Sequence, residues 1–77
     1  MNTQLLLAKI EEHGLSKTFV AEYLGLTRQG FYNKLNGDCE FKGSEIKQLI
    51  RLLELSEPEQ WAIFFADDVG ENVNSLT

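Results

Sequence analysis

Cysteine, histidine, proline and tryptophan each occur only once in this chain of 77 residues. A single cysteine, Cys39, can form neither an internal disulfide nor a cysteine-based zinc site. The single histidine, His13, has no second histidine nearby and no serine or cysteine in position to act as its nucleophile. We therefore expect His13 to be a solvated residue at the end of the first helix.

The chain also lacks long apolar runs and any recognisable catalytic set. No stretch approaches the length of a membrane span, and the N-terminus has no basic segment followed by an apolar core and a cleavage site. We expect a cytoplasmic protein with no membrane contact. No acid/base pair, nucleophile constellation or metal set is visible, so we expect no enzyme activity and no cofactor.

Charge is unevenly distributed along the chain, whose net charge is −5. This value is awkward for a DNA-binding protein, because duplex affinity relies on cations that displace phosphate counterions. Residues 1–37 hold four cations and three carboxylates, a net of +1, whereas residues 38–77 hold three cations and nine carboxylates, a net of −6. The acidity therefore lies away from the first half, and we expect weak DNA binding or help from a partner.

The apolar residues recur at helical spacing and predict an all-α domain of five helices. Its length suits one hydrophobic core and no second one. Residues 1–66 should form the domain, and residues 67–77, which are acidic and rich in Gly and Asn, a disordered tail. The expected helices span residues 3–13, residues 17–24, Arg28–Leu35, Ser44–Leu53 and Glu57–Phe65.

The stretch KTFVAEYLGLTRQGFYNKLNG, residues 17–37, predicts two short helices joined by a tight turn. Gly25 can end the first helix in a left-handed conformation, and Thr27 can cap the second. Ala21 is small where the two helices would cross. With Phe31 and the closing Asn36-Gly37, this pattern resembles the helix-turn-helix of the phage Cro and lambda-repressor family. That family commonly has Gln at its first position, where this chain has Lys17.

The resemblance implies that the second helix of this unit is a DNA recognition helix, whose N-terminal residues meet base edges in the major groove. Arg28 can bind guanine, and Gln29 or Asn33 can bind adenine. Contacts to phosphates position a protein without specifying sequence. An ordinary solvated surface is the alternative interpretation for each polar residue, and Tyr32 could instead pack on a lysine. The complete candidate set for binding DNA or a repressor is Lys17, Thr27, Arg28, Gln29, Tyr32, Asn33, Lys34, Asn36 and Lys42.

Trp61 and Phe65 lie four residues apart on one face of the last expected helix. They either fill a small core or form an exposed apolar patch for a homodimer or another protein. If Trp61 lies outside the core, dimerisation is favoured, because paired DNA half-sites require a two-fold partner.

The segment from Tyr32 to Phe65 also looks like small proteins from the lysogeny switches of prophages in Gram-positive bacteria. The resemblance implies a Cro-like transcriptional regulator in a bacterial host cell, which would bind double-stranded operator DNA and occlude a promoter. Some such proteins instead act as modulators or antirepressors that bind the phage repressor protein. Both functions remain open from the sequence.

Overall fold

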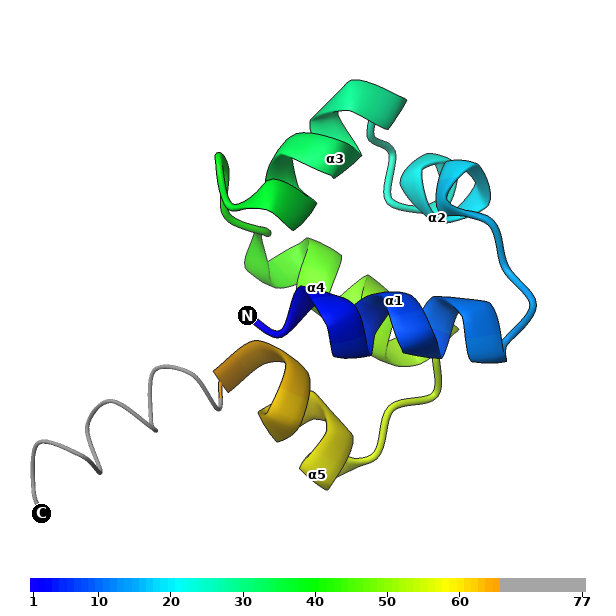
Figure 1. The fold of residues 1–77 in the computed structure, drawn as a ribbon, viewed down its shortest axis with the longest axis vertical. Coiled ribbons are helices and arrows are strands. Elements are labelled where there is room, and N and C mark those ends of the chain that lie inside the picture. The colour runs from blue at the N-terminus through cyan, green and yellow to red at the C-terminus, as the bar shows by residue number, and fades with distance from the viewer. Residues whose placement is uncertain (66–77) are drawn as a thin grey trace, which may run out of the picture.

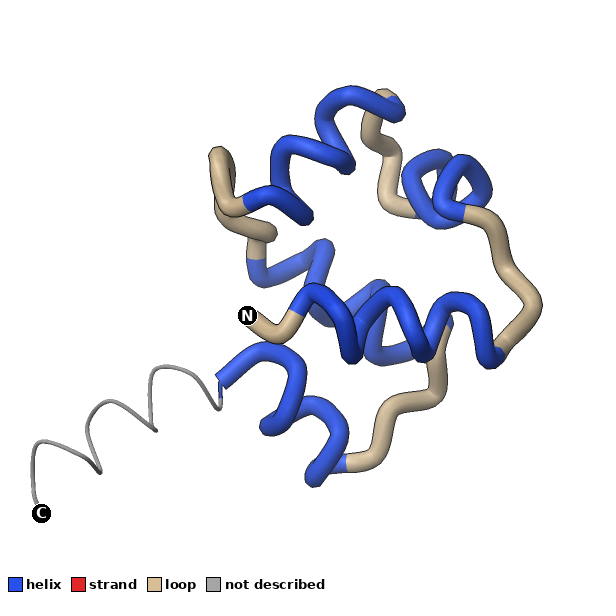
Figure 2. Tube along the Cα trace, in the orientation of Figure 1, coloured by secondary structure: helices blue, strands red, loops and turns tan. Residues whose placement is uncertain are grey.

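The computed structural model describes residues 1–65 of the chain, and within them it contains helices and connecting loops without any strand (Figures 1 and 2). The predicted all-α fold with five helices is therefore confirmed. The expected tail and its boundary at residue 66 lie outside the described residues. The helices are α1 (Thr3–Glu12), α2 (Lys17–Tyr23), α3 (Arg28–Asn36), α4 (Gly43–Leu52) and α5 (Glu57–Gln60), which continues as a π-helical segment, η1 (Trp61–Phe65).

Polar side chains fix where several of these helices begin. The side-chain oxygens of Asn2, Ser16 and Thr27 accept hydrogen bonds from backbone N–H groups in the first turns of α1, α2 and α3. At α5, Ser56 accepts from the Glu59 N–H while the Glu59 carboxylate accepts from the Ser56 N–H. These bonds satisfy donors that a helix N-terminus otherwise leaves unpaired. The two reciprocal bonds at Ser56 and Glu59 form a capping box.

The helix-turn-helix unit consists of α2, α3 and the turn between them. Figure 1 looks almost along the axis of α2 while α3 lies across the view, so the two helices cross at a steep angle. Gly25 has φ +73°, the left-handed conformation that a Cβ disfavours. The Leu26 N–H donates to the Ala21 carbonyl at 2.9 Å, which closes the turn. Ala21 is 2% exposed, so a larger side chain would have little free space there.

The core is formed by apolar side chains from α1, α2, α3, α4 and η1 and from the loops between helices. Leu6 and Ile10 of α1 are buried, and Leu7 packs against them at the edge. Along α4 and its C-cap, Leu49 and Leu53 are buried, and the apolar residues at 46 and 50, which lie at helical spacing from them, are partly buried. Phe41, in the link before α4, packs edge-on against Phe31. The other buried apolar side chains are Val20, Ala21, Leu24, Leu35, Leu55, Ile63 and Phe64.

The last helix differs from the sequence prediction in two ways. It is α-helical only as far as Gln60, after which the wider π turn carries the adjacent pair Ile63 and Phe64 into the core. Trp61 is 51% exposed and Phe65 is 45% exposed, so the interpretation that they fill the core is wrong. Ile63 and Phe64 already supply the buried face of this short helix.

The end of the last helix is attached to the beginning of the chain. The Asn2 N–H donates to the Ile63 carbonyl at 2.6 Å, and the Lys9 ammonium forms an ion pair with the Glu59 carboxylate. Figure 1 shows the N-terminus beside the C-terminal end of this helix. Within residues 1–65 no helix combines the length and the apolar character needed to cross a membrane.

Candidate nucleic-acid interface

The polar residues of α3 separate from its apolar residues as the helical pattern predicts. Phe31 is fully buried and Leu35 nearly so, which fixes α3 against the core. Arg28 and Gln29 are exposed and Asn33 is partly exposed. The three candidate base-reading residues therefore belong to the solvent-accessible part of α3.

Gln29 and Asn33 are joined by a hydrogen bond between their side chains. Gln29 Nε2 donates to Asn33 Oδ1 at 2.9 Å. With the amides oriented this way, Gln29 Oε1 and Asn33 Nδ2 are not used in the bond. One acceptor and one donor complement the N6 amine and N7 of adenine in the major groove. The two amides can thus act together on one base.

Tyr32 brings the cations of two helices together. The guanidinium carbon of Arg28 lies 5.8 Å from the Tyr32 ring centroid, and Lys17 Nζ lies 5.9 Å from it. Both distances are within the range of cation–π attraction. The first residue of α2 and the first residue of α3 thereby share one aromatic neighbour. This cluster of Lys17, Arg28 and Tyr32 puts positive charge beside the candidate residues Gln29 and Asn33 of the same surface.

Thr27 has a structural role in addition to its candidate contact with DNA. Its hydroxyl oxygen accepts from the Gly30 N–H at 3.0 Å and so caps α3. A Cβ built on Gly30 would lie 3.0 Å from the same oxygen. This close contact with the cap is an intramolecular reason for glycine at position 30.

The Lys34 ammonium group forms contacts within the fold. Its Nζ lies 2.7 Å from Glu45 Oε1 and 3.4 Å from the Glu40 carbonyl oxygen. Burial acts to raise the pKa of the Glu45 carboxyl, but hydrogen bonds from Lys34 and from the Lys42 N–H outweigh it and lower that pKa below its ordinary value. A phosphate contact by Lys34 would have to compete with this ion pair.

The remaining two candidates lie beyond the helix-turn-helix core. Asn36 is exposed at the last residue of α3, and Lys42 is exposed at the N-cap of α4. Only the Lys42 backbone N–H is engaged with Glu45, at 2.8 Å. They do not belong to the cluster around Tyr32.

Two features of this surface were missed at the level of sequence. Glu45 is buried and links Lys34 to the start of α4, although nothing in the local pattern distinguishes it from the exposed carboxylates. Phe19 and Tyr23 of α2 are exposed, with ring centroids 6.4 Å apart. Their spacing of four residues was visible, but their direction depends on how α2 packs.

Comparisons of the chain with protein-family models, with curated proteins and with solved structures find no match.

Proposed function

We propose that this protein is a Cro-like transcriptional regulator of a prophage genetic switch, which binds operator DNA through α3 in the cytoplasm of a bacterial host. The observation that carries the proposal is the joint exposure of Arg28, Gln29 and Asn33 on a helix whose other face is buried. In a helix-turn-helix these positions meet base edges. The mechanism is occlusion of a promoter, without catalysis.

Charge supports a division of roles within the surface. Arg28 supplies a planar fork for guanine, and the Gln29–Asn33 pair supplies a donor and an acceptor for adenine. Lys17 supplies a cation for phosphate. The Tyr32 ring holds Lys17 and Arg28 near one another, so positive charge is concentrated on this surface although the whole chain is acidic.

The test is a titration of the purified chain against the promoter DNA next to its gene, at low and at moderate salt. We expect salt-sensitive binding that Arg28→Ala weakens by about 1 to 3 kcal/mol at sites containing the matching guanine. Arg51→Ala is the matched control, because it removes an exposed cation from the last turn of α4. Equal losses in the two variants would mean that α3 has no special role, and no binding of the unaltered chain would contradict operator recognition.

A second candidate function is that of a modulator that binds the phage repressor and masks its DNA-binding surface. The half-exposed Trp61 and Phe65 and the net charge of −5 favour it. The cations around Tyr32 would then meet carboxylates on the repressor. Repeating the titration with the adjacent repressor separates the two functions. A modulator changes the DNA affinity of the repressor while showing no DNA binding of its own.

A further inference from the structure

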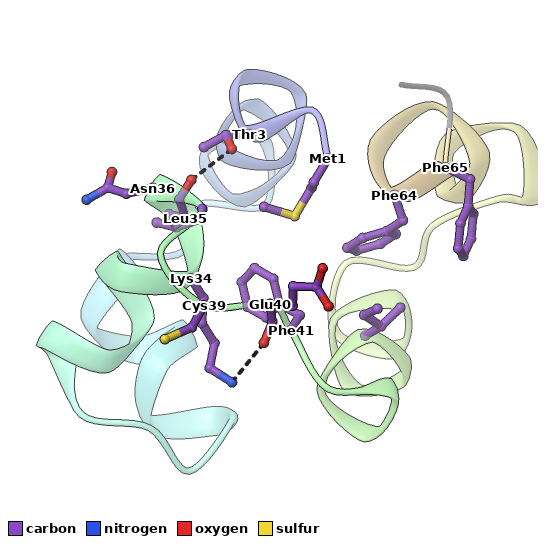
Figure 3. Close-up of a pocket in the computed structure, with 12 residues that line it drawn as sticks. Met1, Thr3, Lys34, Leu35, Asn36, Cys39, Glu40, Phe41, Phe64 and Phe65 are labelled. Atoms are coloured by element: carbon purple, nitrogen blue, oxygen red, sulfur yellow. Dashed lines mark hydrogen bonds between the residues drawn. The ribbon is translucent and has the colours of Figure 1, made fainter. Parts of the chain in front are cut away.

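The C-terminal end of α3 is attached to α1 by a hydrogen bond from a side chain. Thr3 Oγ1 donates to the Leu35 carbonyl oxygen at 3.0 Å, in a partly buried contact between residues that are 32 positions apart in the chain (Figure 3). Thr3 is the first residue of α1, but its hydroxyl does not cap that helix, because the Asn2 side chain accepts the capping bond from the Leu5 N–H. The Thr3 hydroxyl therefore serves α3 and not the helix to which it belongs.

The Leu35 carbonyl needs this donor because of the turn that ends α3. A helix leaves the carbonyl groups of its last turn without backbone partners. Gly37 has the left-handed φ of +90°, which turns the chain back on itself. The Cys39 N–H would donate to Leu35 if the helix continued, but it lies 3.4 Å from the Asn33 carbonyl oxygen instead. Thr3 thus satisfies an acceptor that the backbone of α3 does not.

Two polar contacts at this end attach α3 to different neighbours. The Lys34 ammonium pairs with Glu45 of α4, and the Thr3 hydroxyl bonds to α3 from α1. The apolar packing beneath α3 is non-directional, so these two contacts are the ones that define its tilt. Arg28 begins the helix about 10 Å away along its axis, so a change of tilt at the C-terminal end displaces Arg28 most.

The start of α1 is itself held in place. The Asn2 N–H donates to the Ile63 carbonyl at 2.6 Å, and the Lys9 ammonium pairs with the Glu59 carboxylate. Both bonds attach α1 to the last helix. Thr3 therefore belongs to a segment that is anchored on its other side as well.

We propose that Thr3 is a positioning residue of the candidate recognition helix, whose hydroxyl fixes the tilt of α3 and thereby the places at which Arg28, Gln29 and Asn33 meet the bases. Thr3 acts through α3, without a contact to DNA of its own. The inference rests on the proposed function, which assigns base reading to α3, and adds to it a residue outside the helix-turn-helix unit. Base readout requires donors and acceptors in register, whereas phosphate contacts hold any sequence. Loss of the bond should therefore lower specific binding and spare non-specific binding.

Amide hydrogen exchange of the free full-length chain, followed by NMR, tests the attachment without DNA. Thr3→Val removes the hydroxyl and keeps the shape of the side chain. A hydrogen bond is worth about a fivefold change in an equilibrium constant, so we expect about fivefold faster exchange of the Asp38 N–H, which closes the end of α3 by bonding to Asn33. The Leu24 N–H, which bonds to the Val20 carbonyl at the end of α2, should exchange at an unchanged rate.

DNA titrations at one salt concentration test the consequence. Thr3→Val should bind the promoter site up to about fivefold more weakly, with unchanged affinity for unrelated DNA of the same length. Thr3→Ser keeps the hydroxyl and should restore both the exchange rate and the promoter affinity. Thr18→Val is the matched control, because it makes the same replacement at an exposed position of α2. Far-ultraviolet circular dichroism verifies that each variant keeps its helical content.

Several results would overturn the proposal. These are an unchanged exchange rate of Asp38 in Thr3→Val, an equal acceleration at Asp38 and Leu24, an unchanged promoter affinity, equal losses for promoter and unrelated DNA, or no rescue by Thr3→Ser. If the unaltered chain binds no promoter DNA, the proposed function fails and the role of Thr3 in base reading fails with it. The exchange rates still decide in that case whether Thr3 holds the end of α3.

Discussion

Lys34 of α3 and Glu45 of α4 form an ion pair that is almost enclosed by the fold, with Nζ and Oε1 2.7 Å apart and side-chain exposures of 11% and 7%. The same carboxylate accepts from the Lys42 N–H at the start of α4. One side chain therefore joins the end of the candidate recognition helix to the beginning of the next helix. The pair fixes the position of α3 and at the same time occupies a cation that the sequence pattern had assigned to phosphate.

Removing one member of this pair should destabilise the protein strongly. Glu45→Ala leaves the Lys34 ammonium without its ionic partner in a mostly enclosed position, for which we expect a loss of about 3 kcal/mol in the free energy of unfolding. The double variant Lys34→Met/Glu45→Leu should be clearly more stable than Glu45→Ala, because no unpaired charge remains. Urea unfolding of the three proteins measures both effects. A double variant that is as unstable as Glu45→Ala would show that the pair has no such role.

Acid should weaken the contact between α1 and α5. The hydrogen bond from Lys9, together with those from Ser56, lowers the pKa of the Glu59 carboxyl from its ordinary value of 4.5 to about 2. A carboxyl whose pKa is lower in the folded state stabilises that state when ionised. Its contribution is therefore complete above pH 4.5 and is lost as the pH falls toward 2.

The measurement is the melting temperature of Glu59→Gln as a function of pH, followed by circular dichroism. We expect this variant to melt below the unaltered chain at neutral pH and the difference to shrink as the pH falls from 4.5 toward 2. Glu57→Gln is the matched control, because it removes an exposed carboxylate from the same helix without touching Lys9. If Glu57→Gln shows the same dependence on pH, general charge repulsion is responsible and not the contact with Lys9.

Replacing Gly30 by alanine should not increase the stability of the protein, although this replacement inside a helix usually does. Alanine is favoured over glycine inside a helix by about 1 kcal/mol. At this position the new Cβ would meet the Thr27 hydroxyl at 3.0 Å and disturb a cap whose loss costs about 1 kcal/mol. We expect the two effects to cancel in urea unfolding. Gly43→Ala has nothing within 4 Å of its Cβ and should be stabilising, so an equal gain at both positions would refute the conflict with the cap.

Features that depend on a few neighbouring residues could be predicted from the sequence. The caps at Ser16, Thr27 and Ser56 are local, because the acceptor and donor are three residues apart. The turn at Gly25 and the buried positions of Phe31 and Leu35 follow from helical periodicity in the same way. The element order and the division of α3 into buried and exposed sides could therefore be predicted from the sequence.

Features that depend on tertiary packing could not be predicted from the sequence. Lys34 and Glu45 are 11 positions apart, and no periodic pattern relates them. The last helix has apolar residues on more than one side, so its sequence could not decide which side faces the core. Ile63 and Phe64 face the core, whereas Trp61 and Phe65 are half-exposed.

Tyr32 should contribute to DNA binding through its contacts with two cations. Its ring lies 5.8 Å from the Arg28 guanidinium carbon and 5.9 Å from Lys17 Nζ, so it orients two cations but carries no charge of its own at neutral pH. We expect Tyr32→Leu to weaken DNA binding by about 0.5 to 1 kcal/mol, a two- to fivefold loss, because the cation–π attraction disappears.

The dependence of the DNA affinity of Tyr32→Leu on salt should equal that of the unaltered chain, since both cations remain. Lys17→Ala should instead lower the slope of log affinity against log salt by about 0.9, the value for one released counterion. Measuring affinity for promoter DNA across a salt series separates the two effects. A slope that falls in Tyr32→Leu would mean that the tyrosine itself contacts a phosphate, and the orienting role would then be wrong.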